Sequence, residues 1–350
     1  MIRQRPVELL APARNVECAM AAVDHGADAV YIGASRFGAR ASAGNSVEDI
    51  ARVVEYAHTF RVKVYVTVNT ILKDEELPET EKLVWALYRA GVDALIVQDM
   101  ALLELDLPPI PLHASTQMDN RTPDKVKFLH GLGFSQVVLA RELSLAEIQA
   151  VHAACDVPLE VFVHGALCVS YSGQCYVSQH CFGRSANRGE CAQFCRLKFD
   201  MVDSDGRMIE QGRHLLSLKD MNRGADLERL LDAGVTSLKI EGRLKDVAYV
   251  KNVTAWYRSR LDEIFKRRPE YCRASSGHVS LAFTPCLEKS FNRGFTRYFL
   301  DGRTPDIFSF HTPKSLGEEV GTVKDVRGRC IVVSGVKPFA NGDGLCFLDE

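Results

Sequence analysis

The chain contains 350 residues, 46% of them hydrophobic and 25% charged, which is the composition of an ordinary globular protein. Its 43 Lys and Arg residues nearly cancel its 45 Asp and Glu residues, which excludes a globally basic nucleic-acid binder but leaves room for a local basic patch. The 11 cysteines, behind a start without an apolar signal-peptide core, argue against a secreted disulfide scaffold and for a cytoplasmic protein. Apolar runs such as Ala94–Val97 are far shorter than the roughly 18 residues that a membrane helix needs, so we expect no membrane segment.

Short aliphatic runs alternate with longer segments of helical spacing from Val7 to Phe265. The runs predict strands at Val7–Ala11, Ala29–Ile32, Lys63–Val68, Ala94–Val97, Pro111–Ala114, Gln136–Leu139, Leu159–Val163 and Ser237–Ile240. The segments between and after them predict helices at Val16–His25, Val47–Phe60, Glu76–Ala90, Thr122–Leu132, Leu145–Ala154, Ala225–Ala233 and Ala248–Phe265. This alternation predicts a parallel (β/α)₈ barrel of the TIM type over residues 1–268. A doubly wound open sheet is the alternative, although no G-x-G-x-x-G motif follows the first strand.

Two further parts interrupt or follow the barrel pattern. Residues 165–235 form a long insertion after the seventh strand, and its segment Lys198–Glu210 predicts a hairpin. Residues 269–350 predict a small β-rich module. Its expected strands are His278–Phe283, Glu319–Val326, Cys330–Ser334 and Leu345–Leu348. Because the last of these runs ends the sequence, we expect the module to be incomplete.

The insertion holds the strongest chemical signal, four cysteines at unequal spacing. They are Cys168, Cys175, Cys191 and Cys195, and Cys181 lies among them. Thiolates are soft ligands, so four of them suit either a tetrahedral zinc ion or an iron–sulfur cluster. Zinc ribbons favour two C-x₂₋₄-C pairs, whereas Cys168 and Cys175 are further apart. The pattern therefore favours a cluster, and a zinc site or four packed thiols are the alternatives.

Active sites of such barrels lie at the carboxyl ends of the strands, which selects a set of polar residues. We expect catalytic roles for Glu241, Arg243, His164, Glu142 and Arg141, and substrate binding by Arg40, Asn69, His113, Gln117, Arg184 and Lys245. Arginine suits phosphates and carboxylates because its planar fork binds both in a bidentate manner. Each of these side chains also has a structural reading. The arginines would then form surface ion pairs, Glu241 would pair with Arg243 and Glu142 with Arg141, and the histidines would pack in the core. Tyr171 and Tyr176 in the insertion would stack on a base or pack internally.

Several segments together resemble one known family, the collagenase-like peptidase family U32. They are Glu8–Ala13, Gly26–Gly33, Phe162–Cys168, Gly189–Arg196, Lys239–Arg243 and Phe291–Phe295. Within the family the chain is most similar to the branch that hydroxylates cytidine in 23S ribosomal RNA. Sister branches hydroxylate tRNA uridine or the ubiquinone ring.

The resemblance implies a cofactor, a co-substrate and a partner. It implies a [4Fe–4S] cluster bound by the four cysteines Cys168, Cys175, Cys191 and Cys195. It also implies prephenate as co-substrate and RNA as partner, ribosomal RNA first and tRNA as the alternative. Members of this branch are long chains, so the resemblance implies further sequence beyond Glu350.

Two other functions stay open at this stage. A peptidase needs a nucleophile beside a base, and His164 with Cys168, or one of Ser115, Ser170 and Ser172, would have to supply it. No G-x-S-x-G or H-E-x-x-H motif is present to support this reading. A non-catalytic, zinc-stabilised barrel that associates with RNA is the remaining alternative.

Overall fold

The computed structural model describes residues 4–38, 44–335, 337–338 and 341–347. Eight parallel strands form a closed barrel in the order of the sequence, because the last of them, β11, pairs with both β7 and β1. The strands are β1 (Arg5–Ala13), β2 (Ala29–Gly33), β3 (Lys63–Val68), β4 (Ala94–Val97), β5 (Leu112–Ala114), β6 (Gln136–Val138), β7 (Leu159–Ala166) and β11 (Val235–Ile240). The predicted (β/α)₈ barrel is thus confirmed, and so are all eight predicted strands.

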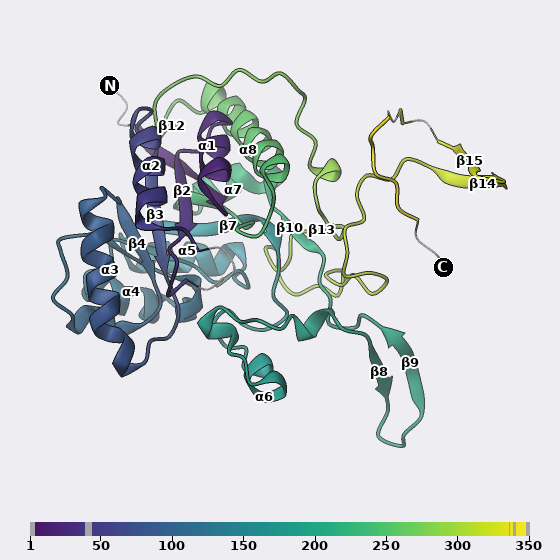
Figure 1. Cartoon of the computed structure of the whole chain (residues 1–350), viewed down its shortest axis with the longest axis horizontal. Helices are drawn as coiled ribbons and strands as arrows, with labels where there is room; N and C mark the ends of the chain where they lie inside the picture. The colour runs from purple at the N-terminus through teal and green to yellow at the C-terminus, as the bar shows by residue number, and fades with distance from the viewer. Residues whose placement is uncertain (1–3, 39–43, 336, 339–340, 348–350) are drawn as a thin grey trace.

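Helices surround the barrel (Figure 1). They are α1 (Val16–Asp24), α2 (Val47–His58), α3 (Leu77–Arg89), α4 (Pro123–Gly131), α5 (Leu145–Ala154), α7 (Leu227–Asp232) and α8 (Val247–Arg267). Five of them begin where the side chain of an N-cap residue accepts a hydrogen bond from the backbone N–H three residues further on. These N-caps are Asn15, Ser46, Thr122, Ser144 and Asp246. All seven predicted helices are confirmed. After β4 the chain makes only a short 3₁₀ helix, Met100–Glu104.

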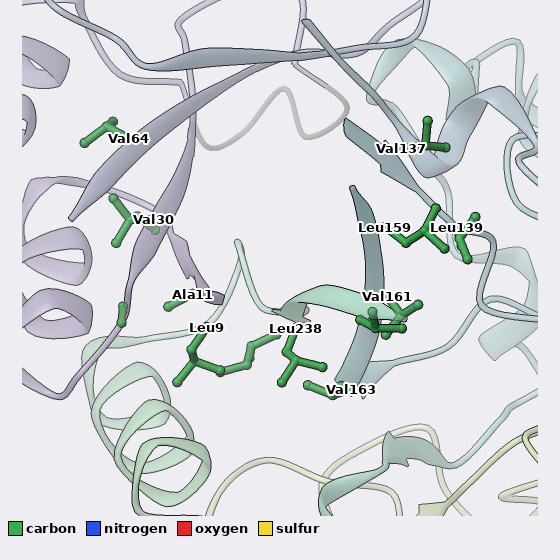
Figure 2. Close-up of a cluster of buried hydrophobic side chains, with 14 of the residues drawn as sticks. Leu9, Ala11, Val30, Val64, Val137, Leu139, Leu159, Val161, Val163 and Leu238 are labelled. Atoms are coloured by element: carbon green, nitrogen blue, oxygen red, sulfur yellow. The ribbon is translucent and has the colours of Figure 1, made fainter. Parts of the chain in front are cut away.

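The core has two layers because successive residues of a strand face opposite sides of the sheet. Leu9, Val30 and Val64 belong to a large buried cluster that also contains helix residues, and Figure 2 shows several of its strand side chains around the ring. Leu10 and Tyr31, each one residue further along its strand, belong to a smaller cluster of the alternate strand positions. Burial of both layers fixes the register of the strands, since a one-residue slip would exchange the two sets.

The insertion between β7 and β11 contains a short helix α6 (Val177–Phe182) and a hairpin of β8 (Phe199–Val202) and β9 (Met208–Arg213), which extends away from the barrel (Figure 1). The predicted hairpin is therefore confirmed. The insertion ends in β10 (Asp220–Asn222), which returns antiparallel to β7.

The C-terminal part is partly as expected. β14 (Thr322–Arg327) and β15 (Cys330–Ser334) form a two-stranded sheet, while β12 (Tyr271–Arg273) pairs with β1 and β13 (Phe295–Thr296) pairs with β10. The predicted strand at 278–283 is wrong, because these residues pair with no strand in the described structure. Instead, Val279 lines a small cavity beside Phe60, and Phe283 contacts His25. Residues 345–347 are likewise not a strand, and Leu348 lies outside the described residues. None of the helices in the described ranges is long and apolar enough to cross a membrane.

Candidate active site

The four cysteines of the insertion lie close enough to affect one another electrostatically. Burial raises the pKa of the Cys168 thiol to about 11, and the neighbouring Cys195 and Cys175 add to that rise although part of Cys168 is exposed. Burial also raises the pKa of Cys195, and Cys191 and Cys175 contribute. Cys181 lies in α6, is exposed, and is not among the groups that contribute most to either shift. Cys175, Cys191 and Cys195 thus lie near enough to Cys168 or to one another to contribute to these two pKa shifts.

Contacts with three different loops hold the insertion on the carboxyl end of the barrel. After β6, Glu142 accepts hydrogen bonds from the backbone N (2.6 Å) and the Oγ (2.9 Å) of Ser172. After β5, Gly173 packs so closely on Gln117 that a Cβ on the glycine would lie 2.0 Å from the carbonyl oxygen. The segment between Cys168 and Cys175 is thus fixed to the barrel mouth.

The third contact uses Arg188 and the loop after β3. The Arg188 guanidinium donates to both carboxylate oxygens of Glu76, at 2.6 and 2.9 Å, and to the backbone oxygen of Ile71 at 2.6 Å. The hydrogen bond from Arg188 lowers the pKa of Glu76 to about 2. Closer to β7, Arg196 donates to the backbone oxygens of Leu167 and Leu218, which fixes the end of the cysteine segment.

At the centre of the barrel mouth, Arg141 after β6 forms an ion pair with Glu241 after β11. Arg141 Nη2 lies 2.8 Å from Glu241 Oε2, and both side chains are largely buried. The Arg141 guanidinium also lies over the ring of Phe162 at 3.6 Å from the centroid. Its charge is among those that lower the pKa of Cys168, so this pair and the cysteine group are neighbours.

Two more cations follow Glu241 in the loop after β11. Arg243 is buried and donates to Thr67 Oγ1 at 2.6 Å. Lys245 lies over the ring of Phe291, with Nζ 3.0 Å from the centroid, and burial lowers its pKa to about 8, opposed by Asp220. Arg141, Glu241, Arg243 and Lys245 therefore all lie in the loops after β6 and β11.

The two predicted histidines are both deeply buried and neutral. Burial lowers the pKa of each to about 3. His164 lies among the rings of Tyr249, Tyr257 and Phe295, and its Nδ1 is 3.4 Å from Tyr257 Oη. His113 contacts the ring of Tyr65 edge-on.

The other predicted substrate-binding residues have different positions. Asn69 is buried and donates to Ser115 Oγ at 3.2 Å, and Gln117 is half-buried beside Gly173. Arg184 is exposed on the insertion, while Arg40 lies outside the described residues. A cavity of about 980 Å³ lies elsewhere, between α7, α8 and residues 295–306, and none of the four cysteines lines it.

A family model described as peptidase family U32 matches residues 14–308, which is most of the chain and includes the barrel strands from β2 to β11, the cysteine insertion and β13.

The chain belongs to peptidase family U32.

Three curated U32 relatives carry names of different kinds. The chain is 55% identical over 98% of its length to the 23S rRNA 5-hydroxycytidine C2501 synthase of Escherichia coli, and covers 52% of that protein. It is 36% identical over 99% of its length to the tRNA hydroxylation protein P1 of Bacillus subtilis, covering 84% of it. It is also 32% identical over 85% of its length to a collagenase of Porphyromonas gingivalis, covering 74% of it. The U32 chain thus spans about half the length of the Escherichia coli relative.

Sequence reasoning missed some residues of this U32 site. Asp220 accepts from the backbone N of Arg293 at 2.8 Å and from its guanidinium at 3.1 Å, both groups being nearly buried. This pair joins β10 to the segment before β13 and shifts the pKa of Lys245. Phe291–Phe295, which contains Arg293, is one of the segments that resemble the family, but β10 is only three residues long and shows no pattern of its own. Thr67 was also missed, although its place in β3 two residues before Asn69 was a usable signal.

Proposed function

We propose that this U32 chain hydroxylates a pyrimidine base of RNA, with cytidine in 23S ribosomal RNA as the first candidate and tRNA as the alternative. The observation that carries the proposal is the position of the four-cysteine group beside the Arg141–Glu241 pair at the mouth of a barrel. The names of the Escherichia coli and Bacillus subtilis relatives, which describe rRNA and tRNA hydroxylation, supply the reaction and the substrate class.

We propose Cys168, Cys175, Cys191 and Cys195 as ligands of a [4Fe–4S] cluster. The spacing of the thiols along the chain supports a cluster over one zinc ion, because Cys168 and Cys175 are further apart than the C-x₂₋₄-C pairs of zinc sites and each thiolate of a cluster binds a different iron. When bound, such a cluster supplies electron transfer.

The barrel residues take complementary roles in this proposal. Arg141, Arg243 and Lys245 surround the end of β11 with positive charge, which suits the two carboxylates of prephenate or an RNA phosphate. Glu241 keeps 16% of its side chain exposed, and we assign it proton transfer with Arg141 as its partner. Glu142 holds Ser172 and so positions the insertion. Asn69, with Ser115, lies at the carboxyl end of β3, where an amide group can face a base edge.

The arrangement gives less support to peptidase chemistry. A cysteine or serine nucleophile needs a base within hydrogen-bond reach. His164 Nδ1 has Tyr257 Oη as its neighbour, Ser115 receives a hydrogen bond from Asn69, and Ser172 donates to Glu142. Within the described parts of the chain, none of these serines is hydrogen-bonded to a histidine.

The cofactor assignment is tested by metal analysis of anaerobically purified protein. We expect about four irons and about four sulfides per chain, little zinc, and a brown colour. Replacement Cys191→Ser should reduce the iron content strongly, whereas Cys181→Ser, the matched control in the same insertion, should leave it unchanged. Stoichiometric zinc without sulfide would overturn the cluster assignment.

The reaction itself is tested by nucleoside analysis. An Escherichia coli strain that lacks its own synthase would express this chain, and 5-hydroxycytidine in its 23S rRNA and the hydroxylated uridine of its tRNA would be measured by mass spectrometry. We expect 5-hydroxycytidine to return in a manner that depends on Cys191 and on prephenate supply. Digestion of gelatin by cluster-free protein, together with no change in either RNA, would instead favour the peptidase reading.

A further inference from the structure

Tyr171 is a large aromatic side chain that the fold holds rigidly and yet leaves 44% exposed. The next residue, Ser172, is bonded twice to Glu142, and Gly173 after it packs directly on Gln117. These contacts fix the backbone directly after Tyr171, and Arg121 and Arg303 contact its side chain. A rigid, exposed aromatic ring is a suitable surface for stacking, because little entropy is lost when a planar ligand binds to it.

Two arginine side chains, whose guanidinium groups are planar and positively charged, lie beside the ring of Tyr171. The guanidinium of Arg121 lies over the ring at 4.1 Å from its centroid, and Asp119 holds that guanidinium with two hydrogen bonds. Arg303 donates from Nη2 to Tyr171 Oη at 3.2 Å. Because Asp119 balances Arg121, that arginine enlarges the stacking surface more than it adds charge. Arg303 is exposed, and in the parts of the chain that the structure describes no carboxylate forms an ion pair with it.

The position of Tyr171 connects this surface with the proposed reaction centre. It lies three residues after Cys168 and four residues before Cys175. Three residues span at most about 11 Å of extended chain, so the ring lies within the length of a nucleotide or two of the cysteine group. Tyr176, another exposed aromatic residue of the insertion, has no side-chain hydrogen bond or ring contact within the described ranges.

We propose that Tyr171, extended by Arg121, is a stacking platform for an unpaired base of single-stranded RNA, and that Arg303 contacts an adjacent phosphate. The proposal rests on the proposed RNA hydroxylation and adds the group that positions the RNA. A bare apolar surface would suit a protein or a lipid. A single ring with the Arg121 guanidinium stacked on it, and with the Arg303 guanidinium beside it that forms no ion pair with a carboxylate in the described residues, matches the alternating bases and phosphates of RNA. A splayed, unpaired base is also what a modifying enzyme requires.

The test uses fluorescence of a short single-stranded RNA with 2-aminopurine at its centre, titrated with the whole chain at fixed salt. Stacking on a ring quenches this fluorophore. We expect the wild-type chain to quench it, and Tyr171→Leu to lose the quenching and bind roughly 5-fold to 100-fold more weakly. Tyr171→Phe and Tyr171→Trp keep a ring and should retain both signals, which a purely structural role of the hydroxyl would not predict. Phe128→Leu, an exposed aromatic on α4, is the matched control and should behave as wild type.

A second readout concerns the phosphate contact. Arg303→Gln should lower the slope of the logarithm of affinity against the logarithm of salt concentration by about 0.7, the value for one phosphate contact on a single strand. Unchanged quenching and affinity of Tyr171→Leu beside a wild-type chain that binds RNA would overturn the platform alone. A wild-type chain that neither binds nor modifies RNA would overturn the proposed function as well.

Discussion

Arg141 and Glu241 are 100 residues apart in sequence and form an ion pair of 2.8 Å across the end of β7. The pair is largely buried, so removal of one partner leaves the other charge without compensation. Glu241→Gln should therefore reduce RNA hydroxylation at least about 10-fold if Glu241 transfers a proton, with a loss of unfolding free energy of about 1–3 kcal/mol. Product formation and thermal unfolding would be measured on the same samples. Glu79→Gln, at an exposed ion pair with Arg36, is the control and should change neither quantity appreciably. Full activity of Glu241→Gln would remove Glu241 from the catalytic set.

The close contact between Gly173 and Gln117 predicts a large effect of a single methyl group. Gly173 has φ of +78°, and an added Cβ would lie 2.0 Å from the Gln117 oxygen, so Gly173→Ala must displace the insertion from the barrel. Gly183 also has a positive φ, +64°, but an added Cβ there would meet nothing within 4 Å. We expect Gly183→Ala to cost about 1 kcal/mol and Gly173→Ala to cost several times more and to lower iron retention. Equal effects of the two variants, measured by thermal unfolding and iron content, would contradict the contact.

The ion pair of Arg188 with Glu76 predicts that backbone amides of the cysteine insertion are protected from hydrogen exchange. Arg188→Gln removes three charge-assisted hydrogen bonds to the loop after β3, and we expect a local loss of about 1–2 kcal/mol, reduced by the partial exposure of the pair. Hydrogen exchange of amides in residues 183–190 should become about 5-fold to 30-fold faster while the barrel strands stay unchanged. Arg184→Gln, an exposed neighbour, should leave the exchange rates at their wild-type values.

Glu8, on β1 inside the barrel, predicts a pH dependence of stability. Burial raises its pKa to about 7, opposed by hydrogen bonds from Tyr65 and Ser237. In the unfolded chain the pKa is about 4.5, so between pH 4.5 and 7 the folded chain binds more protons than the unfolded chain. The contribution of Glu8 to stability is therefore complete below pH 4.5 and is lost as the pH rises through 7.

Denaturant unfolding of Glu8→Gln at several pH values checks this expectation. The variant carries no titratable group at this position, so its unfolding free energy should fall less than that of the wild type between pH 5 and 8. Wild-type and variant curves that run parallel over this range would show that Glu8 ionises normally in the folded chain.

Much of the fold could be predicted because the barrel elements carry strong local patterns. The strands of the barrel are aliphatic runs, and the helices start at N-cap residues such as Ser144. β10 and β13 could not be predicted in the same way. They contain three and two residues, and long-range pairing holds them in place: β10 pairs with β7, and β13 pairs with β10. The prediction of a strand at 278–283 was wrong for the opposite reason: the residues alternate as in a strand, but in the described structure no other strand pairs with them.

The site could be predicted as a set of positions but not as a set of partners. The strand-end rule placed Arg141, Glu142 and Glu241 at one end of the barrel, and the structure agrees. The sequence suggested that Glu142 would pair with its neighbour Arg141, whereas Ser172 of the insertion bonds Glu142 and Glu241 pairs with Arg141. Adjacent residues leave a strand end in different directions, so closure of the barrel, and not sequence proximity, decides which charges meet.

The direct pairing of β7 with β11 has a consequence for the order of assembly. The two ends of the insertion lie on neighbouring strands, and the entropy of closing so long a loop grows only slowly with its length. The barrel can therefore close before the insertion's thiols bind any metal, so in the proposed cluster assignment metal loading is a late step on a folded scaffold. Under the same proposal, an apoprotein that has lost its cluster to oxygen keeps the barrel on which a new cluster can be assembled.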